Sequence, residues 1–398
     1  MNEPHGALSG LRVLDLTRVL AGPFCTMMLA DMGAEVIKIE QPGKGDDTRH
    51  FAPFQNGESA YYMNLNRGKK GVTLNLKGEG REIFLELVKT ADVVVENYRP
   101  GTMEKLGLGY DTLKEVNPRL VYAAVSGFGD TGPYRLRPGY DIIAQAMGGL
   151  MSTTGWPGGE PTRSGTAMAD VLAGLSVTIG LLAALRYRDQ AGVGQKVDVA
   201  LVDSVVASLE IITQIYLTDG RVPERIGNRY ESCYPYDSFA ARDGSVVIAA
   251  ANDKLWRLVC RTIEQPAMAD DELFDTNAKR VQRHAAIKPL IEQWTRTREI
   301  DEIVEKMLAA GVPASPINTV DRLVTDPHIA GAREMFVDVE HPKAGKTKLT
   351  GAHIKLSATP ARVHAAAPLL GEHNEAVFGG LLGLAADNLA RLRSEGVI

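Results

Sequence analysis

The chain has 398 residues, enough for about two or three domains of roughly 150 residues each. Hydrophobic residues make up 44% and charged residues 23% of the sequence, which is typical of a folded globular protein and excludes extensive disorder. The formal net charge of -5 excludes a basic surface over the whole chain of the kind that binds nucleic acid.

The first 126 residues alternate between short apolar runs and helical patterns. Such alternation is typical of βαβ units and predicts an α/β fold with a mostly parallel sheet. The predicted strands cover residues 11–17, 35–40, 72–76, 93–96 and 120–126, and the predicted helices cover residues 24–32, 79–90 and 111–116. Ligands of parallel sheets bind outside the carboxyl ends of the strands, here residues 17–23, 41–48, 97–102 and 127–133.

The remaining chain begins with a stretch rich in glycine and proline. The stretch predicts loops, and the uncharged segment that follows predicts a buried helix, since it is shorter than the ~20 residues that span a membrane. Later patterns indicate a second, smaller α/β unit and a terminal surface helix. In order, we expect loops at 127–169, the buried helix from Asp170, a strand at 196–201, a helix at 205–217, an irregular segment at 219–244, a strand at 245–251, and helices at 254–263, 284–310 and 385–398.

Residues 127–132 read GFGDTG and match the GxGxxG pattern of dinucleotide sites. In such sites the glycine loop opens a helix. Here Pro133 follows directly and Pro138 comes soon after, so we expect a flexible loop and no nicotinamide or flavin site.

The three cysteines, Cys25, Cys233 and Cys260, lie far apart and form no zinc or disulfide pattern. This usage is typical of a reducing compartment. The first ten residues lack the apolar core of a signal peptide. We therefore expect a cytoplasmic protein.

Asp170 is an isolated carboxylate between a small-residue segment, 165–169, and the uncharged helix. One interpretation is an N-cap that accepts hydrogen bonds from free backbone N–H groups. The other is a carboxylate nucleophile, because small neighbours leave room for a substrate and carboxylates form covalent acyl intermediates. No histidine occurs between residues 51 and 283, so a histidine-activated nucleophile would need one from a distant segment.

Basic and polar residues gather near the predicted strand ends. They fit either a solvated rim or a pocket for a phosphorylated anion. These residues are Lys44, Arg49, Asn97, Arg99, Lys105, Arg135 and Arg137.

Eight segments, taken together and in order, resemble the family III CoA-transferases, also called the CaiB/BaiF family. The resemblance runs from about Leu8 to about Val377. The segments are LSGLRVLDLTRVLAGP, GAEVIKIEQPGKGD, NLNRGKK, VVVENYRPGTMEKLGLGYDTL, SGFGDTGPY, RPGYDIIAQAMGGLMSTTG, SGTAMADVLAGL and PLLGEHNEAV.

The resemblance implies a Rossmann-like large domain built from both ends of the chain, with a smaller α/β domain inserted. We assign residues 1–215 to the first part of the large CoA-binding domain, 216–330 to the small domain with its linkers, and 331–398 to the return linker and the last part of the large domain. The resemblance also implies an interlocked homodimer, acyl-CoA and carboxylic acid substrates, and no metal or other cofactor. We expect neither nucleic acid nor a membrane as a partner.

The resemblance further implies roles for single residues. Asp170 matches the aspartate of the family's GxAxxD segment, which is the covalent nucleophile. Tyr140 matches a tyrosine of the substrate pocket. The CoA-contacting positions carry over to Val19, Ala21, Lys77, Asn97, Tyr98, Arg99 and Lys105.

Some positions depart from particular branches of the family. The α-methylacyl-CoA racemases carry a proton-transferring histidine where Tyr140 stands, and the formyl-CoA:oxalate transferases carry a glutamine where Leu20 stands. The segment 226–230, IGNRY, resembles a turn of other transferases in the family that use larger acids. We therefore expect a short donor such as succinyl-CoA and a dicarboxylate acceptor, whose distal carboxylate pairs with Arg163 or Arg18. A racemase-type isomerase and a non-catalytic CoA-binding protein are the alternatives.

Overall fold

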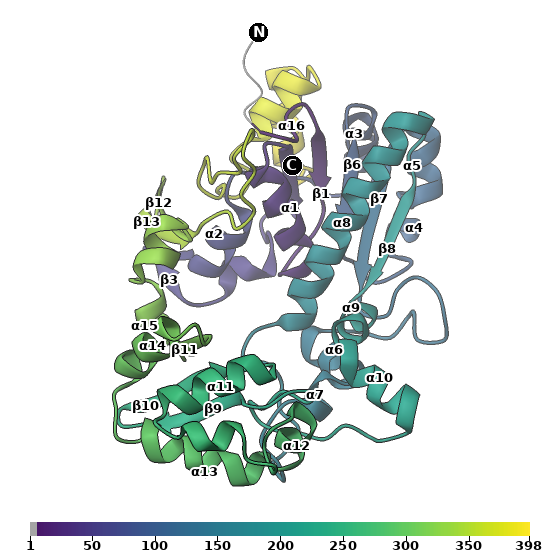
Figure 1. Ribbon diagram of the computed structural model, residues 1–398. Helices are drawn as coiled ribbons and strands as arrows, with labels where there is room; N and C mark the ends of the chain where they lie inside the picture. Colours follow the sequence, from purple (N-terminus) through teal and green to yellow (C-terminus); the bar gives the residue numbers. More distant parts are fainter. Residues whose placement is uncertain (1–5) are drawn as a thin grey trace. The chain divides into compact units, whose positions relative to one another are not determined.

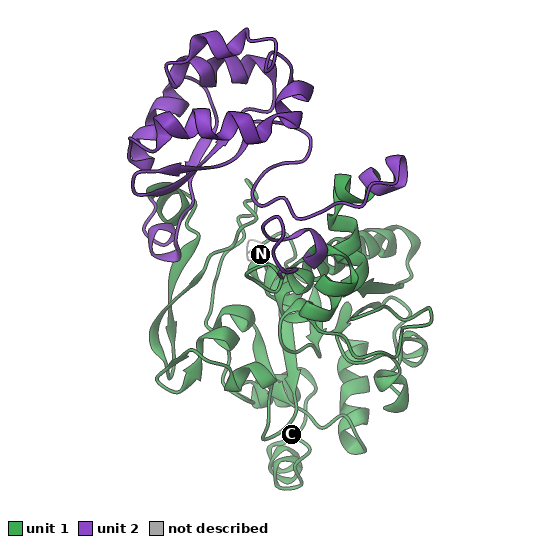
Figure 2. Ribbon diagram, turned by 90° about the horizontal axis from the view of Figure 1, so that it is seen from below, with its two compact units in different colours: residues 1–150, 163–214, 327–398 green, residues 151–162, 215–326 purple. Residues whose placement is uncertain are grey.

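The computed structural model describes residues 6–398 (Figure 1). It divides into two compact units, coloured separately in Figure 2. The larger unit takes the chain up to residue 150, residues 163–214 and residues 327–398, and the smaller unit takes residues 151–162 and 215–326. Residues 151–162, which the sequence analysis assigns to the large domain, thus group with the smaller unit.

The larger unit is built on a six-stranded sheet whose strands all run parallel, as the α/β pattern predicts. In spatial order the strands are β5 (Lys70–Thr73), β2 (Glu35–Glu40), β1 (Arg12–Asp15), β6 (Val93–Glu96), β7 (Val121–Ser126) and β8 (Lys196–Ala200). The chain runs outward from β1 through β2 to β5 and then returns to β6 on the other side of β1. The strand order therefore reverses between β1 and β6.

Both faces of this sheet are buried, because alternate side chains of each strand point to opposite sides. Val13 and Val93 pack on one face, and Leu14 and Val94 on the other. The first face is covered by α1 (Ala21–Asp31), α8 (Met168–Ala191) and α9 (Leu201–Ser208), and the second by α3 (Glu79–Lys89), α5 (Tyr110–Val116) and α16 (Ala386–Ser394). The last helix shows that the C-terminal segment returns to the unit in which the chain begins (Figure 1).

Short elements complete the larger unit. Two antiparallel hairpins pair β3 with β4 and β12 with β13. Their bounds are β3 (Phe54–Gln55), β4 (Glu58–Ser59), β12 (Phe336–His341) and β13 (Gly345–Thr350), and the remaining helices are a 3-10 helix (Asp47–His50), α2 (Ala60–Asn66), α4 (Thr102–Lys105), α6 (Asp141–Met147), and two π-helices (Pro327–Ala332 and Glu375–Leu381).

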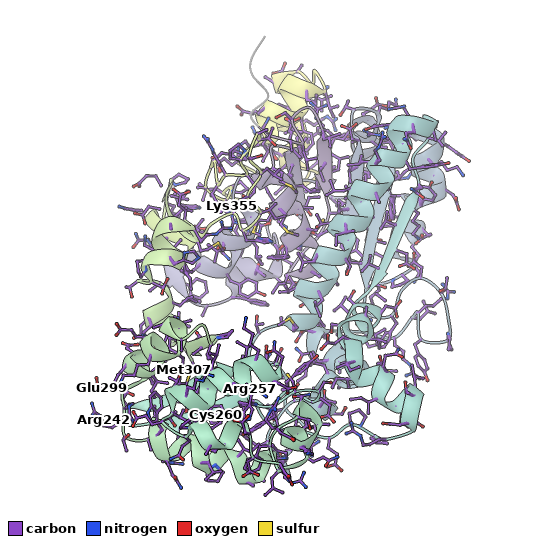
Figure 3. The ribbon with its side chains drawn as sticks, viewed as in Figure 1. Arg242, Arg257, Cys260, Glu299, Met307 and Lys355 are labelled. Carbon is purple, nitrogen blue, oxygen red and sulfur yellow. The ribbon has the colours of Figure 1, made fainter. Side chains whose placement is uncertain are left out.

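The smaller unit has a core of its own around a three-stranded antiparallel sheet. Its buried side chains include Cys260 and Met307, while Arg242 and Glu299 form an exposed ion pair of 2.5 Å (Figure 3). The elements are β9 (Tyr236–Ala241), β10 (Gly244–Ala249), β11 (Ala314–Pro316), α11 (Asp253–Thr262), a 3-10 helix (Pro266–Ala269), α12 (Asn277–Gln282), α13 (His284–Thr295), α14 (Ile300–Ala309) and α15 (Val320–Leu323). Helices α7 (Leu150–Thr153) and α10 (Glu210–Asp219) each cross from one unit to the other.

Four sequence expectations need correction. The glycine-rich stretch 127–169 contains α6 and α7 as well as loops. The predicted helix 205–217 is instead α9 and α10, which are bent by 73° where Glu210 takes a positive φ of 37° that an α-helix cannot hold. The expected helix 284–310 is divided into α13 and α14, and the expected irregular segment 219–244 ends in β9, which exists because it pairs with β10.

Helix α8 is long and apolar enough to cross a membrane by length and composition, and the bent pair α9–α10 passes the same test among the described residues. In this structure α8 packs against α1. A Cβ atom added to Gly174 would lie 2.8 Å from the carbonyl oxygen of Ala21, so this glycine permits the close approach of the two helices. Gly174 is one turn beyond Asp170, and the contact therefore ties the start of α8 to the start of α1.

Candidate active site

The site lies where the strand order of the sheet reverses. In open parallel sheets the loops after two strands diverge at such a point and leave a crevice at their carboxyl ends. Here the diverging loops follow β1 and β6, and they carry Arg18 and Asn97 respectively. The reversal therefore places the first and third predicted binding loops side by side.

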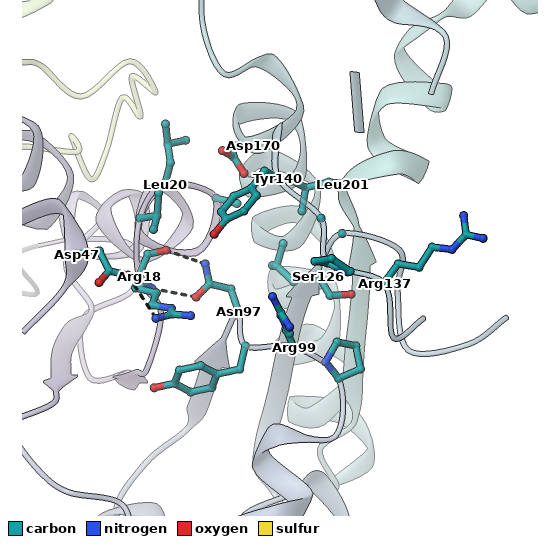
Figure 4. Close-up of a pocket in the computed structure, with 18 residues that line it drawn as sticks. Arg18, Leu20, Asp47, Asn97, Arg99, Ser126, Arg137, Tyr140, Asp170 and Leu201 are labelled. Carbon is teal, nitrogen blue, oxygen red and sulfur yellow. Dashed lines mark hydrogen bonds and ion pairs between the residues drawn. The ribbon is translucent and has the colours of Figure 1, made fainter. Parts of the chain in front are cut away.

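A cavity of about 160 Å³ opens between these loops. Figure 4 shows the carboxylate of Asp170 and the ring of Tyr140 at the top of the cavity, with the guanidinium groups of Arg18 and Arg99 below them. The lining residues are Arg18, Val19, Leu20, Ala21, Asp47, Asn97, Tyr98, Arg99, Pro100, Val125, Ser126, Gly127, Arg137, Pro138, Gly139, Tyr140, Asp170 and Leu201. Backbone segments that are distant in the sequence thus meet around one carboxylate.

Two reciprocal hydrogen bonds join the loop after β1 to the loop after β6. The amide of Asn97 accepts from the backbone N–H of Arg18 at 2.9 Å and donates to its carbonyl oxygen at 2.7 Å (Figure 4). Val19 follows with a φ of 67°, a conformation that β-branched residues rarely adopt. Because such strain persists only where the surroundings hold it, the Asn97 clamp fixes the shape of this wall of the cavity.

A buried ionic network supports the same loop from below. Lys38 has no exposed side-chain surface and donates to the Thr17 carbonyl at 2.8 Å and to the Asp46 carboxylate at 2.9 Å. Burial alone would lower the pKa of Lys38, but the negative charges of Asp46, Asp15 and Glu40 together outweigh it and raise the pKa to about 12. Asp46 in turn accepts from the N–H of Val19 at 3.3 Å. The pair stays ionised and connects the strained loop to strand β2.

A second buried ion pair anchors the end of β1. Lys69 donates to the Asp15 carboxylate at 2.9 Å and to the Thr26 hydroxyl at 2.7 Å. Burial favours a raised pKa for Asp15, yet the charge of Lys69 and the hydrogen bonds of Thr17 and Thr26 lower it. The carboxylate therefore remains charged and fully paired, as a structural group should.

Glu96 is the last residue of β6 and holds the start of the loop that follows this strand. Its carboxylate accepts from the N–H of Tyr98 at 2.7 Å and from the hydroxyl of Tyr122 at 3.2 Å. Burial is the main cause that raises its pKa to about 7. The hydrogen bond to the backbone sets the direction in which the loop leaves the sheet.

Asp170 differs from these carboxylates because no described residue donates a hydrogen bond to it. It lies in the first turn of α8 and is half-buried at the cavity wall. Burial raises its pKa to about 7, and the negative charge of Asp141 acts in the same direction. At neutral pH the group is thus partly ionised, accessible from the cavity and free of a protein partner within the described part of the chain.

The capping interpretation of Asp170 is wrong in this structure. The N-cap position of α8 is Ala167, and the Asp170 side chain makes no capping bond. Instead Asp141, from α6, accepts from the N–H of Ala169 at 2.9 Å. A side chain of another helix thus accepts the hydrogen bond at the start of α8, and the Asp170 carboxylate is not used for capping.

The structure places most of the predicted site residues around the cavity. Val19, Ala21, Asn97, Tyr98, Arg99, Tyr140 and Asp170 all line it, as does Arg18. Lys77, Lys105 and Arg163 are exposed and lie outside the lining. For all of these residues, inside or outside the lining, the assigned role in CoA binding, substrate binding or catalysis stays a prediction.

Several neighbours of Asp170 escaped the sequence analysis. One of them is Tyr61 in α2. Burial is the main cause that raises the pKa of its phenol to about 12, and the negative charge of Asp170 is the next. Ser126 and Leu201 also line the cavity. Ser126 and Leu201 each stand at the end of a predicted strand, which is the one signal that the sequence offered for them.

Comparison with known proteins agrees with this architecture. The profile of CoA-transferase family III matches residues 8–374. The chain belongs to this family. Succinyl-CoA:mesaconate CoA-transferase of Haloarcula hispanica is 43% identical over 92% of this chain and 94% of that protein, and acetyl-CoA:oxalate CoA-transferase of Acetobacter aceti is 42% identical over 89% of this chain and 90% of that protein. The crystal structure of a CaiB/BaiF family protein from Brucella suis superposes with a TM-score of 0.84 at 38% identity, covering 95% of this chain and 100% of that one.

This family III CoA-transferase therefore has the fold and the enzyme class that the sequence resemblance implies. The prediction of a parallel sheet is confirmed, and so is the activity class. The glycine motif at 127–132 opens no helix, since the next helix, α6, begins only at Asp141.

The raised pKa of Asp170 predicts a pH-dependent cost in stability. The ordinary value is 3.8 and the folded value about 7, so folding disfavours the ionised form, and wild-type stability falls as pH rises between these values. Three pKa units correspond to roughly 4 kcal/mol, which partial exposure reduces to about 2 kcal/mol. We expect Asp170→Asn to raise Tm, with a gain that grows from pH 5 to pH 8. Thermal unfolding at both pH values measures this, and an equal gain at both would contradict it.

Proposed function

We propose that this transferase moves CoA from succinyl-CoA to a dicarboxylate through covalent intermediates on Asp170. The observation that carries the proposal is a carboxylate without a protein hydrogen-bond donor, in the described part of the chain, at the wall of a cavity lined by arginines. A carboxylate in this environment is poorly stabilised and is therefore a better nucleophile than one held in an ion pair.

The chemistry follows from one carboxylate replacing another. Asp170 attacks the thioester carbonyl of the donor, which forms an aspartyl–acyl anhydride and expels the CoA thiolate. The thiolate then attacks the aspartyl carbonyl, which gives an aspartyl–CoA thioester and releases the donor acid. The acceptor carboxylate attacks this thioester, and the returning thiolate takes the acceptor acyl group from the new anhydride and regenerates Asp170.

The protein's task in this sequence is to hold the thiolate and to stabilise the developing oxyanions. We assign the binding of CoA to the two loops that frame the cavity. Their contacting residues in this proposal are Val19, Ala21, Asn97, Tyr98 and Arg99, with Lys77 in the turn between β5 and α3 and Lys105 at the end of α4. Tyr140 is 72% exposed, and in this scheme its hydroxyl donates a hydrogen bond to the bound acyl group.

A dicarboxylate acceptor is supported by both curated relatives, since mesaconate and oxalate each carry two carboxylates. Of the two arginines considered for the distal carboxylate, Arg18 lines the same cavity as Asp170 and Arg163 does not. Arg18 is 49% exposed and its one ion pair among the described residues, to Asp47, is 3.3 Å long, so the guanidinium is available to a ligand. We therefore assign the distal carboxylate to Arg18.

The central prediction concerns Asp170 directly. Asp170→Asn keeps the size of the side chain but removes the nucleophilic oxygen pair, so we expect acyl exchange to fall below detection while CoA still binds. Hydroxylamine added during turnover should convert the wild-type intermediate to a hydroxamate at Asp170, which peptide mass spectrometry locates.

The matched control is Asp387→Asn, which changes an exposed carboxylate at the start of α16 outside the cavity. It should retain wild-type exchange. Near-normal turnover by Asp170→Asn, or a hydroxamate on a different carboxylate, would refute the nucleophile.

The acceptor assignment predicts a selective effect at Arg18. In a panel of acids assayed with succinyl-CoA and acetyl-CoA, dicarboxylates should be preferred over monocarboxylates. Arg18→Gln should raise the KM for the dicarboxylate about tenfold through the lost ion pair, with little change for the donor. Arg163→Gln serves as the control; a larger effect there, or an effect of Arg18→Gln on the donor alone, would contradict the assignment.

We also propose that the enzyme is a homodimer. The outer side of α8 exposes Ile179 by 68% and Tyr187 by 49%, and α9 exposes Val206 by 47%, an apolar surface that a second copy would cover. Light scattering should give a mass near twice the 43.0 kDa of one chain, and Ile179→Glu should lower it. A monomeric mass for the wild-type protein at micromolar concentration would overturn the proposal.

A further inference from the structure

We propose that Asp141 and Gln145 are positioning residues of the transferase, which clasp the segment before Asp170 and hold its carboxylate at the cavity wall. The proposal rests on the role assigned to Asp170 above. The two residues lie one turn apart on α6, so their side chains project from the same face of the helix. Neither was considered in the sequence analysis.

Gln145 is fully buried, with 0% exposure, and both ends of its amide are used. Its oxygen accepts from the N–H of Ser164 at 3.0 Å and from the Ser164 hydroxyl at 3.3 Å. Its nitrogen donates to Asp141 at 2.8 Å and to the carbonyl oxygen of Thr166 at 3.4 Å. One side chain thus holds the backbone at two points, at Ser164 just before the small-residue segment and at Thr166 within it.

Asp141 completes the clasp one residue before the nucleophile. One carboxylate oxygen accepts from the N–H of Ala169 at 2.9 Å, and the other accepts from Gln145. Ala169 itself is fully buried. Because the direction of the Asp170 side chain follows from the backbone of α8's first turn, fixing Ala169 fixes the carboxylate.

The small residues of this segment explain why a clasp is needed. At Gly165 an added Cβ would have no atom within 4 Å, so the side of the backbone where a side chain would stand faces open space. Side-chain hydrogen bonds from a neighbouring helix hold the backbone in place of side-chain packing. The space in front of Asp170 stays open for a substrate while the backbone behind it is immobilised.

Asp141 also acts on Asp170 through its charge. Two carboxylates near each other destabilise one another's ionised forms, and the carboxylate that lacks hydrogen bonds is affected more. Asp141 is the charged group whose field raises the pKa of Asp170, after the effect of burial itself. The other charged or titratable groups of the packed elements and the cavity are Arg18, Asp47, Arg99, Arg137, Tyr98 and Tyr140 at the lining, Tyr61 in α2, Cys25 in α1 and Asp203 in α9.

The two residues predict different kinetic signatures. Asp141→Asn keeps an oxygen that can accept from Ala169 but removes the charge, so the acidic limb of the kcat–pH profile should move to lower pH by about half a unit or more. Gln145→Met removes the clasp and leaves the charge, so kcat should fall roughly tenfold to a hundredfold with the limb in place. A purely structural role would not move the limb in either variant.

A thermal-unfolding cycle tests the coupling without turnover. The rise in Tm that Asp170→Asn produces at pH 8 should shrink in the Asp141→Asn background, since the repulsion is then already gone. The same cycle with Asp387→Asn in place of Asp141→Asn is the control and should leave the rise unchanged.

The outcomes separate this inference from the proposed function. If Asp170→Asn keeps exchanging acyl groups, the nucleophile is wrong, and the unfolding cycle still reports whether Asp141 and Asp170 interact. If Asp170→Asn is inactive while Asp141→Asn moves neither the acidic limb nor the Tm difference, the positioning pair alone is refuted. An unchanged kcat in Gln145→Met would likewise refute the clasp.

Discussion

Burial removes part of the water around the Asp170 carboxylate, and no described residue donates a hydrogen bond in its place. An ionised group in this position raises the free energy of the folded protein. Contacts of the surrounding structure hold the carboxylate in this unfavourable position. Gly174 permits α8 to pack closely against α1, and Asp141 accepts from the N–H of Ala169, so both contacts hold the backbone of the first turn of α8 in place.

Two other buried carboxylates of the larger unit, Asp15 and Asp46, differ from Asp170 in their partners. Asp15 and Asp46 are more deeply buried than Asp170, yet each is paired with a buried lysine and accepts hydroxyl hydrogen bonds. Their pKa values are lowered, whereas that of Asp170 is raised. Full pairing makes the first two inert supports of the loop after β1. In the proposed mechanism, the lack of a hydrogen-bond donor leaves the Asp170 carboxylate free to attack a carbonyl.

Much of this arrangement was predictable because it depends on local patterns. Buried β-strands such as Val93–Glu96 and Glu35–Glu40 follow from apolar runs and alternation, and their carboxyl ends locate the binding loops before any coordinates exist. The small residues before Asp170 also indicated a candidate site, because they leave room for a substrate.

What sequence patterns missed depends on contacts between distant segments. The capping of α8 by Asp141 requires α6, which lies within a stretch whose glycine content predicts only loops. Likewise β9 and the hairpin β12–β13 are defined by their cross-strand partners and not by their own composition. The positive φ of Glu210, which divides one expected helix into two, has no signature in an apolar segment that is helical on both sides.

The step from Gly139 to Asp141 shows how a short segment suits carboxylate exchange. Tyr140 is the N-cap residue of α6 and projects into the cavity, while Asp141, the first helical residue, turns back to hold α8. A phenol donates a hydrogen bond but does not trade protons near neutral pH as an imidazole does. In the proposed reaction one thioester and one carboxylate give another thioester and another carboxylate with no net proton transfer, so no residue has to act as an acid or a base. In the proposed mechanism, these two adjacent positions supply a hydrogen-bond donor to the acyl group and a support for the Asp170 carboxylate.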